Sequence, residues 1–408
     1  MKLRIAMFTE AYLPYINGVI THIKILTEGL TKMGHEVLIV TADPEAKHHY
    51  IKDGILHCPA KSSKRFYGFG LASPFSRTRL KLLKEFDPDI IHLHNEFAVG
   101  YSGISAAKAL KKPVVYTMHT MYDEYVYYVA PAMFTGAVKR IAHSYSRYLA
   151  KRAAALTGPS LKVSEYFKSI GVEKDVKVIP NSVELDSFSP QNISPEQKAQ
   201  FRARYQIPQE DMICCFVGRL GKEKSVDVLL DYWAQSIRPE DRIRLVIIGD
   251  GPEKEALEQQ TRELGIHTMV TFTGKVLHKD IPPYYASCDV YVTASLSDTD
   301  SISMLEGMAT GLPVLQRYDP LNADQVRDNI NGYVFKGPED MAKYLKKIKH
   351  MSTEELNVLK HSVIESVRRS GAADLANYLL SIYQTVVKQK SVGAKSVKPK
   401  RISSKPQT

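Results

Sequence analysis

Two successive series of short apolar segments, with helical stretches between most of them, constrain the fold of this chain most strongly. The first series runs from LRIAMFTE and HEVLIVTA to VKVIPN, and the second runs from MICCFVGR to GYVFK. Between them lies a polar stretch from about Val183 to Pro208, which we interpret as a linker with one short helix. Strands that alternate with helices indicate βαβ units and a parallel sheet. The sequence therefore predicts an α/β protein with two Rossmann-like domains.

The length of the chain, 408 residues, exceeds what one hydrophobic core ordinarily serves, so two domains are expected. We place the first domain over residues 1–188 and the second over residues 189–365. Residues 366–387 are predicted to form a C-terminal helix. Residues 388–408 contain seven basic residues, no acidic residue and no apolar periodicity, so we expect this tail to be disordered.

The composition indicates a folded protein without a membrane-spanning helix. No segment approaches 18 uncharged apolar residues, the length that would predict such a helix. Glu10 and Pro14 follow the first apolar run at once, so the N-terminus is interpreted as a strand and not as a secretion signal. The four cysteines show no metal-ligand spacing, which favours reduced, buried thiols in a cytosolic protein.

The net charge of +11 is unevenly distributed along the chain. Residues 1–190 contain 25 basic and 17 acidic residues, a balance of +8, whereas residues 191–387 contain 23 basic and 27 acidic residues, a balance of −4. A basic first half favours an anionic partner surface. An ordinary solvated face explains the same balance about equally well. The sequence contains no nucleic-acid recognition motif, so we do not expect a nucleic-acid partner.

Three segments of the second series place polar residues or glycines directly after a strand. FVGRLGKEKS contains Arg219 and Lys224, and IIGDGPE contains Gly249 in a turn where the backbone can approach a ligand. Residues 290–314 pass from a strand through a loop with Asp298 into a helix that carries Glu306. A loop between a parallel strand and a helix is where α/β domains bind ligands, and the helix start offers free N–H groups to an anion.

The first series has its own candidate positions after strands. Gly18 stands ahead of a helix, and His119 ends a strand and is followed by Asp123. IHLHNEF places His92, His94 and Glu96 at another strand end, a pattern that can bind a metal ion. Because nothing else in the sequence supplies further ligands, we favour a structural or acceptor-lining role for this pattern and expect no metal site.

The segments of the second series resemble those of retaining GT-B glycosyltransferases of the GT4 type, with Asp298 and Glu306 at the two positions of the E-x7-E motif. The resemblance implies an active site in the cleft between two Rossmann-like domains and a C-terminal helix that crosses back to the first. Asp298 would lie near the transferred sugar, and Glu306 would bind the ribose hydroxyls. The remaining implied donor-binding residues are Gly18, Arg219, Lys224, Gly249, Ser301 and Ile302. Asp298 replaces the usual Glu, and Ser225 and Ser301 replace usual glycines.

Within this family, the order strand–His–Thr–aromatic–acid is similar to that of glucosyltransferases that act on diacylglycerol. The similarity implies that His119 contacts the donor sugar and that Asp123 serves the acceptor hydroxyl. It implies glucose transfer from UDP-glucose to the 3-hydroxyl of 1,2-diacylglycerol, without a tightly bound cofactor, while stimulation by Mg²⁺ stays open. A soluble or polysaccharide acceptor and a catalytically weak nucleotide-sugar-binding homologue are the alternatives. The sequence does not fix the oligomeric state.

Two stretches of the first half combine basic residues with aromatic or apolar ones, as suits an anionic bilayer surface. The candidate membrane-binding residues are Lys61, Lys64, Arg65, Phe66, Arg77, Lys81, Lys139 and Arg140. The alternative is that these side chains extend over ordinary packed helices. We expect a cytoplasmic protein that associates peripherally with the inner face of the cell membrane and meets a lipid acceptor there.

Overall fold

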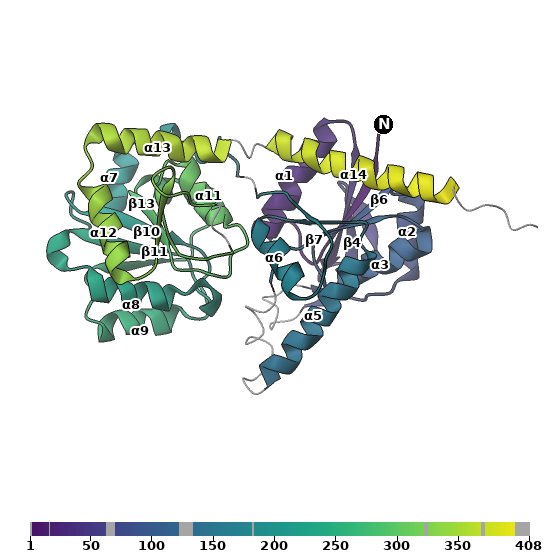
Figure 1. Cartoon of the computed structure of the whole chain (residues 1–408), viewed down its shortest axis with the longest axis horizontal. Coiled ribbons are helices and arrows are strands. Elements are labelled where there is room, and N and C mark those ends of the chain that lie inside the picture. Colours follow the sequence, from purple (N-terminus) through teal and green to yellow (C-terminus); the bar gives the residue numbers. More distant parts are fainter. Residues whose placement is uncertain are drawn as a thin grey trace, which may run out of the picture.

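The computed structural model consists of two α/β domains that lie side by side (Figure 1). It describes residues 2–15, 17–62, 70–121, 134–181, 183–321, 325–368 and 372–395. Each domain is built on its own, mainly parallel sheet with helices on both faces. The predicted fold class, two Rossmann-like domains in the GT-B arrangement, is confirmed.

The sheet of the first domain has the order β3-β4-β2-β1-β6-β7-β8-β9, with β5 paired to β4. Only the pairs that β4 forms with β3 and β5 are antiparallel among the described strands. The strands are β1 (Arg4–Thr9), β2 (Glu36–Asp43), β3 (Tyr50–Lys52), β4 (Ile55–Ser62), β5 (Gly70–Ala72), β6 (Ile90–Leu93), β7 (Val114–Thr117), β8 (Ala155–Gly158) and β9 (Val176–Val178). The helices are α1 (Gly18–Lys32), α2 (Arg77–Phe86), α3 (Ala98–Leu110), α5 (Thr135–Arg152) and α6 (Leu161–Ser169).

The sheet of the second domain is parallel in the order β12-β11-β10-β13-β14-β15. Its strands are β10 (Met212–Val217), β11 (Ile243–Ile248), β12 (Val270–Gly274), β13 (Val290–Thr293), β14 (Val314–Arg317) and β15 (Gly332–Phe335). The helices are α7 (Pro195–Arg204), α8 (Val226–Ser236), α9 (Lys254–Glu263), α10 (Pro282–Ala286), α11 (Ile302–Ala309), α12 (Pro338–Lys349) and α13 (Thr353–Arg368). Strands β10, β13 and the inner part of β11 are buried on both faces, which explains their continuous apolar sequences.

The last described helix, α14 (Ala372–Lys395), packs on the first domain against α1, as Figure 1 shows. Its apolar face, which includes Leu379 and Tyr383, joins a cluster with Ile5 and Leu26 of the first domain. The predicted bounds of this helix, residues 366–387, are wrong at both ends: residues 366–368 belong to α13, and α14 continues to Lys395, into the segment predicted as a disordered tail. The apolar face of α14 ends near Val387. The helix continues beyond this residue because adding residues to an existing helix costs much less free energy than nucleating a new one.

Both sheets reverse their strand order next to their first strand, between β1 and β6 and between β10 and β13. Ligands bind at the carboxyl ends of the strands at such a reversal. The loop after β13 meets the first domain at the boundary, where Thr299 Oγ1 donates to the carbonyl of His119, just after β7, over 3.0 Å. Lys162 of α6 also forms a buried ion pair of 2.6 Å with Asp319 of the second domain. The fold therefore brings the two ligand-binding edges together.

None of the helices in the part of the chain that the structure describes is both long and apolar enough to span a bilayer.

Candidate functional site

The two predicted phosphate-binding cations lie in the loop between β10 and α8, each beside an acid. Lys224 Nζ is 2.5 Å from Asp298 Oδ1, and Arg219 Nη2 is 2.7 Å from Glu223 Oε1. Since Glu223 is nearly fully buried, it fixes the Arg219 guanidinium at the end of β10. The loop therefore holds two oriented cations that an anionic ligand can reach by displacing carboxylates.

The loop ends at Ser225, where the backbone is left-handed with φ of 50°. This conformation favours glycine, which the resembled family usually has here. Ser225 keeps the same turn at some conformational cost, so the departure from the family pattern leaves the loop geometry intact.

Two carboxylates of the acidic motif, Asp298 and Asp300, contact different parts of the protein. Burial would raise the pKa of Asp298, but the Lys224 ammonium outweighs this effect and the net pKa is lowered. Asp300 instead accepts a hydrogen bond of 2.6 Å from the backbone N–H of Asn181 in the first domain. Burial raises the pKa of Asp300 to about 7. The structure thus assigns Asp298 to the cation loop and Asp300 to the contact between the domains.

Ser301 and Ile302 start helix α11. The Ser301 hydroxyl caps the helix by accepting from the Met304 N–H over 3.4 Å, and its own backbone N–H donates to the Gln325 side chain over 3.3 Å. Ile302 lies opposite Gly18 of the first domain, where an added Cβ would come within 3.3 Å of Ile302 Cδ1. These predicted donor-binding residues therefore meet at the domain boundary.

Glu306 is buried in α11, and both of its carboxylate oxygens accept hydrogen bonds. His278 Nε2 lies 2.8 Å from Oε1, and the Tyr285 hydroxyl donates to Oε2 over 3.1 Å. The bond to Glu306 raises the pKa of His278. Sequence reasoning missed His278, although it stands four residues after Gly274, which ends β12. A vicinal diol that binds Glu306 can replace one of these two partners or use the remaining acceptor sites of the carboxylate.

Gly249 has a structural role that no other residue could fill. Its φ is 142°, and an added Cβ would lie 1.9 Å from the Gly218 carbonyl oxygen. The glycine lets the end of β11 approach the start of the cation loop.

Three histidines from separate elements converge on the first-domain side of this boundary. His22 belongs to α1, His94 follows β6 and His119 follows β7. His94 Nδ1 lies 3.0 Å from His119 Nε2, and the His22 and His119 ring centroids are 5.0 Å apart. Burial lowers the pKa of His22 to about 4 and lowers the pKa values of His94 and His119 well below 6.5. All three rings are neutral at pH 7.

The expectation that the sequence supplies no further ligands near His94 is wrong, because α1 and β7 bring His22 and His119 beside it. The other members of the H-x-H-acid pattern point elsewhere. His92 is bonded to the Tyr383 hydroxyl over 2.6 Å, and Glu96 accepts from the Tyr116 hydroxyl over 2.7 Å. His22 was missed by the sequence analysis, although it stands one helical turn after Gly18.

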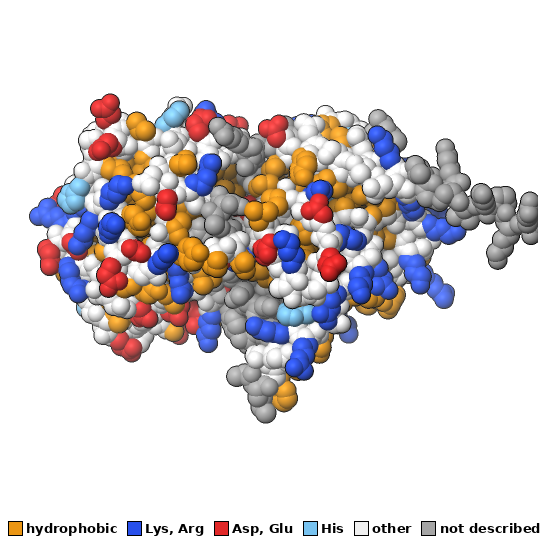
Figure 2. Space-filling view, viewed as in Figure 1, with side chains coloured by type: hydrophobic (Ala, Val, Ile, Leu, Met, Phe, Trp, Pro, Cys, Tyr) orange, Lys and Arg blue, Asp and Glu red, His pale blue; other side chains and the backbone are white. Residues whose placement is uncertain are grey.

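Asp123 and the membrane candidates Lys64, Arg65 and Phe66 lie outside the described residues. Of the other membrane candidates, Lys61, Arg77, Lys81 and Arg140 are exposed and Lys139 is half-buried. Lysine and arginine side chains gather on the visible face of the first domain, whereas acidic and basic side chains mix over the second (Figure 2). The charge difference found in the sequence is therefore visible on this face of the two domains.

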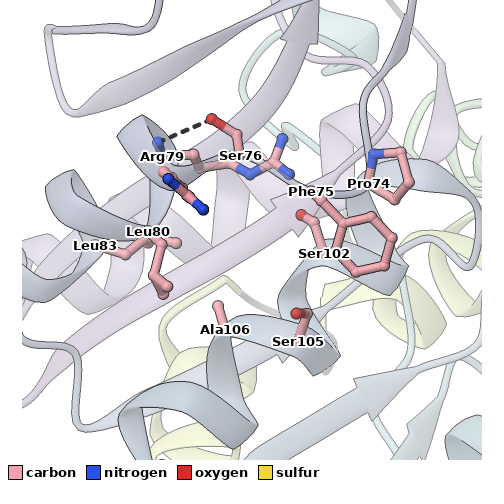
Figure 3. A pocket seen from close by; sticks show the side chains of 10 residues that line it. Pro74, Phe75, Ser76, Arg79, Leu80, Leu83, Ser102, Ser105 and Ala106 are labelled. Carbon is pink, nitrogen blue, oxygen red and sulfur yellow. Dashed lines mark hydrogen bonds between the residues drawn. The ribbon is translucent and has the colours of Figure 1, made fainter.

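A pocket of about 300 Å³ lies between α2 and α3 in the first domain (Figure 3). Leu80, Leu83 and Ala106 give it apolar walls, and Phe75 at its edge is 64% exposed. The buried Arg79 also lines it and donates to the Ser73 carbonyl over 2.8 Å. This pocket was not predicted, because its walls come from two helices that are separate in the sequence.

Two Rossmann-like domains that meet at the ligand-binding edges of their sheets form the GT-B arrangement. Residues 16–187 match the family model described as Glycosyltransferase Family 4, and residues 197–367 match the one described as Glycosyl transferases group 1. The chain belongs to glycosyltransferase family 4, as its motifs predicted.

The relatives in this family differ in donor and acceptor. The chain is 31% identical to the alpha-monoglucosyldiacylglycerol synthase of Streptococcus pneumoniae, over 83% of this chain and 77% of the relative. It is 30% identical to the GDP-mannose-dependent alpha-mannosyltransferase of Mycobacterium tuberculosis, over 76% of this chain and 78% of the relative. The fold also matches the crystal structure of Anabaena HepE in complex with UDP and glucose, with a TM-score of 0.70, 16% identity and coverage of 94% and 100% of the two chains.

Proposed function

We propose that this glycosyltransferase transfers glucose from UDP-glucose, with retention of configuration, to the 3-hydroxyl of 1,2-diacylglycerol at a membrane surface. The observation that carries the proposal is the Lys224–Asp298 pair of 2.5 Å, set opposite His119 across the domain boundary. It combines a cation for the diphosphate with an acid for the sugar. The similarity to the Streptococcus pneumoniae enzyme supports glucose and diacylglycerol, and the UDP and glucose bound to HepE support the donor type.

In this proposal the donor diphosphate replaces carboxylates as the partner of Arg219 and Lys224. A dianionic group competes well for a partly exposed ammonium. Asp298, released from Lys224, is then free to accept a hydrogen bond from a hydroxyl of the transferred sugar. The ribose diol takes the place of His278 or Tyr285 on Glu306. Each existing contact thus holds a side chain ready for a contact with the donor.

Transfer then requires charge stabilisation and positioning more than a protein nucleophile. The bond between the anomeric carbon and the phosphate oxygen breaks, and the acceptor oxygen bonds to that carbon from the same face. The acceptor proton passes to the departing phosphate oxygen, so the nucleotide leaves with the pair of electrons. Arg219 and Lys224 stabilise the charge on the leaving group, and neutral His119 contacts the hexose without adding a positive charge.

The first domain supplies the features that favour a lipid acceptor. Exposed Arg77 and Lys81 stand on α2, beside the apolar pocket with Phe75 at its edge. Each cation near an anionic bilayer contributes about 1 kcal/mol of attraction. We propose that this face rests on the membrane and that the pocket receives part of an acyl chain. The protein would then reach its acceptor as a peripheral enzyme on the inner face of the cell membrane.

A donor-by-acceptor screen tests the proposal. Purified protein is incubated with UDP-glucose, UDP-galactose or GDP-mannose and with diacylglycerol in anionic vesicles, diacylglycerol in neutral vesicles, or soluble saccharides. We expect α-glucosyldiacylglycerol from UDP-glucose, formed fastest on anionic vesicles. Preferential use of GDP-mannose would overturn the donor assignment, and preferential use of a saccharide would overturn the lipid acceptor. No turnover in any combination would leave a nucleotide-sugar-binding homologue as the better description.

A further inference from the structure

The cluster of His22, His94 and His119 has the donor set of a metal site. One ring nitrogen from each residue can be chosen so that the three nitrogens lie within 4.8 Å of one another. Zinc held by imidazoles at about 2.0–2.1 Å in tetrahedral geometry needs nitrogens roughly 3.4 Å apart. Since His94 Nδ1 and His119 Nε2 are already 3.0 Å apart, only small side-chain movements separate the observed arrangement from a coordinating one.

Two nitrogens of this cluster lack hydrogen-bond partners. His22 Nε2 and His94 Nε2 are buried, and no partner for either is found among the residues that the structure describes. Leaving a buried polar atom without a hydrogen-bond partner is energetically unfavourable. Coordination through His22 Nε2 would satisfy one of these two atoms, whereas His94, which faces His119 through Nδ1, would keep its Nε2 unpaired.

The surrounding residues hold the cluster in place. The His92 ring lies beside His94, with ring centroids 4.0 Å apart, and is itself fixed by Tyr383 at 2.6 Å and Thr117 at 2.7 Å. The backbone of His119 is held by Thr299 from the second domain. Such supporting contacts orient metal ligands and strengthen binding.

We propose that His22, His94 and His119 bind one divalent transition-metal ion of borderline softness, best matched by Zn²⁺. Imidazole suits Zn²⁺, whereas Mg²⁺ prefers oxygen ligands. Three protein ligands leave a fourth position open to water or to an oxygen of a bound molecule. The site is separate from the donor cations, because its ligands come from the first domain.

One consequence rests on the proposed function. His119 is the residue proposed to contact the hexose, so a metal ion on its ring occupies the place of the sugar. UDP-glucose should therefore weaken metal binding, whereas UDP, which lacks the hexose, should not. Zn²⁺ would in this way act as an inhibitor that competes with the donor.

Cobalt provides a visible probe for the experiment. The full-length, chelator-treated protein is titrated with CoCl₂, and absorption bands of tetrahedral Co²⁺ are recorded before and after addition of ZnCl₂. We expect one Co²⁺ per chain and loss of the bands with one equivalent of Zn²⁺. His22→Gln and His119→Gln should each weaken Co²⁺ binding by about 100-fold or more, since loss of a supporting contact alone costs 10–100-fold. His48→Gln, which removes an exposed imidazole elsewhere, is the matched control.

The outcomes separate the metal site from the proposed function. Absence of the bands in the unaltered protein, or their persistence in both ligand variants, overturns the site. Loss of binding in His48→Gln alone would show adventitious surface binding and would also overturn it. If His22→Gln fails to fold, the half-buried His119 provides the decisive variant. If Co²⁺ binds as expected but UDP-glucose does not weaken it, the metal site stands and the placement of the hexose at His119 fails.

Discussion

The two domains prepare their halves of the site in opposite ways. The second domain uses charge: Arg219 and Lys224 face Glu223 and Asp298, and these residues come from the loops after β10 and β13. The first domain uses neutral rings from three elements, and burial keeps them uncharged. A diphosphate needs cations that are already oriented, whereas a sugar hydroxyl needs hydrogen-bonding groups that do not add charge. Under the proposed function, the second domain provides charged groups for the diphosphate of the donor, and the first domain provides uncharged groups for its sugar.

The largest effect should come from removing the charged half of the site. Replacing both Arg219 and Lys224 by alanine should lower kcat/KM for UDP-glucose by about 10³-fold or more, because one lost donor to a developing anion costs 10²–10³-fold. Steady-state transfer assays measure it. Lys198→Ala, which removes an exposed lysine of α7, is the control. Unchanged turnover in the double variant would mean that these two cations do not stabilise the departing diphosphate.

Loss of the buried acid should come next. Glu306→Gln keeps the shape of the side chain but removes the charge that a ribose diol would meet. Donor affinity should fall by about 3 kcal/mol, or roughly 100-fold, because hydrogen bonds to charged groups contribute about 1.5–3 kcal/mol each. Isothermal titration with UDP measures the loss. A binding constant equal to that of the unaltered protein would place the ribose elsewhere.

The surface of the first domain offers a smaller effect. Arg77→Glu combined with Lys81→Glu should weaken binding to anionic vesicles by at least about 2 kcal/mol, since two cations of about 1 kcal/mol each are lost. Sedimentation with vesicles measures it, and the loss should shrink in high salt. The same double reversal at Lys254 and Lys279 of the second domain is the control. An equal loss of vesicle binding in both variants would mean that the net charge of the protein, and not the position of the cations on α2, determines binding.

The neutral half of the site should respond to pH. Burial lowers the pKa of His92 to about 3, with a smaller contribution from His22. The unfolded chain therefore binds this proton below pH 6.5 while the folded protein does not. The contribution of His92 to the free energy of unfolding is therefore complete above pH 6.5. It falls by about 1.4 kcal/mol for each pH unit below that value. Urea unfolding at pH 7 and pH 5.5 should show a smaller loss for His92→Gln. An identical loss would mean that His92 is protonated in the folded state.

The smallest effect concerns the backbone of the charged loop. Ser225→Gly should raise the free energy of unfolding by up to about 1 kcal/mol, because a left-handed residue other than glycine costs about 1–2 kcal/mol and glycine loses some of that gain in entropy. Urea unfolding measures it, and donor affinity should stay within twofold. A destabilised variant would indicate that the serine hydroxyl stabilises the turn.

Sequence reasoning worked best where one segment holds both the strand and the functional residue. The buried strands β10 and β13 lead directly into the loops with Arg219 and Asp298, so the positions of these two residues followed from the adjacent sequence. It failed for β3 and β4, whose residues 50–62 contain several charges and a glycine. Strand β4 has only one well-buried face, with Leu56 and Cys58 inside, and its pattern resembles a loop.

The apolar periodicity and the strand-to-loop motifs of this chain determined two Rossmann-like domains and the family, and they placed Arg219, Lys224 and Asp298 in loops after strands. These features are local, because hydrogen-bonded strands and ligand loops are encoded in consecutive residues. Only the tertiary structure brought His22 to His94 and His119, opened the pocket between α2 and α3, and separated the task of Asp298 from that of Asp300. Those arrangements depend on which strands become neighbours and how the domains meet, and burial then sets the charge of the groups enclosed there.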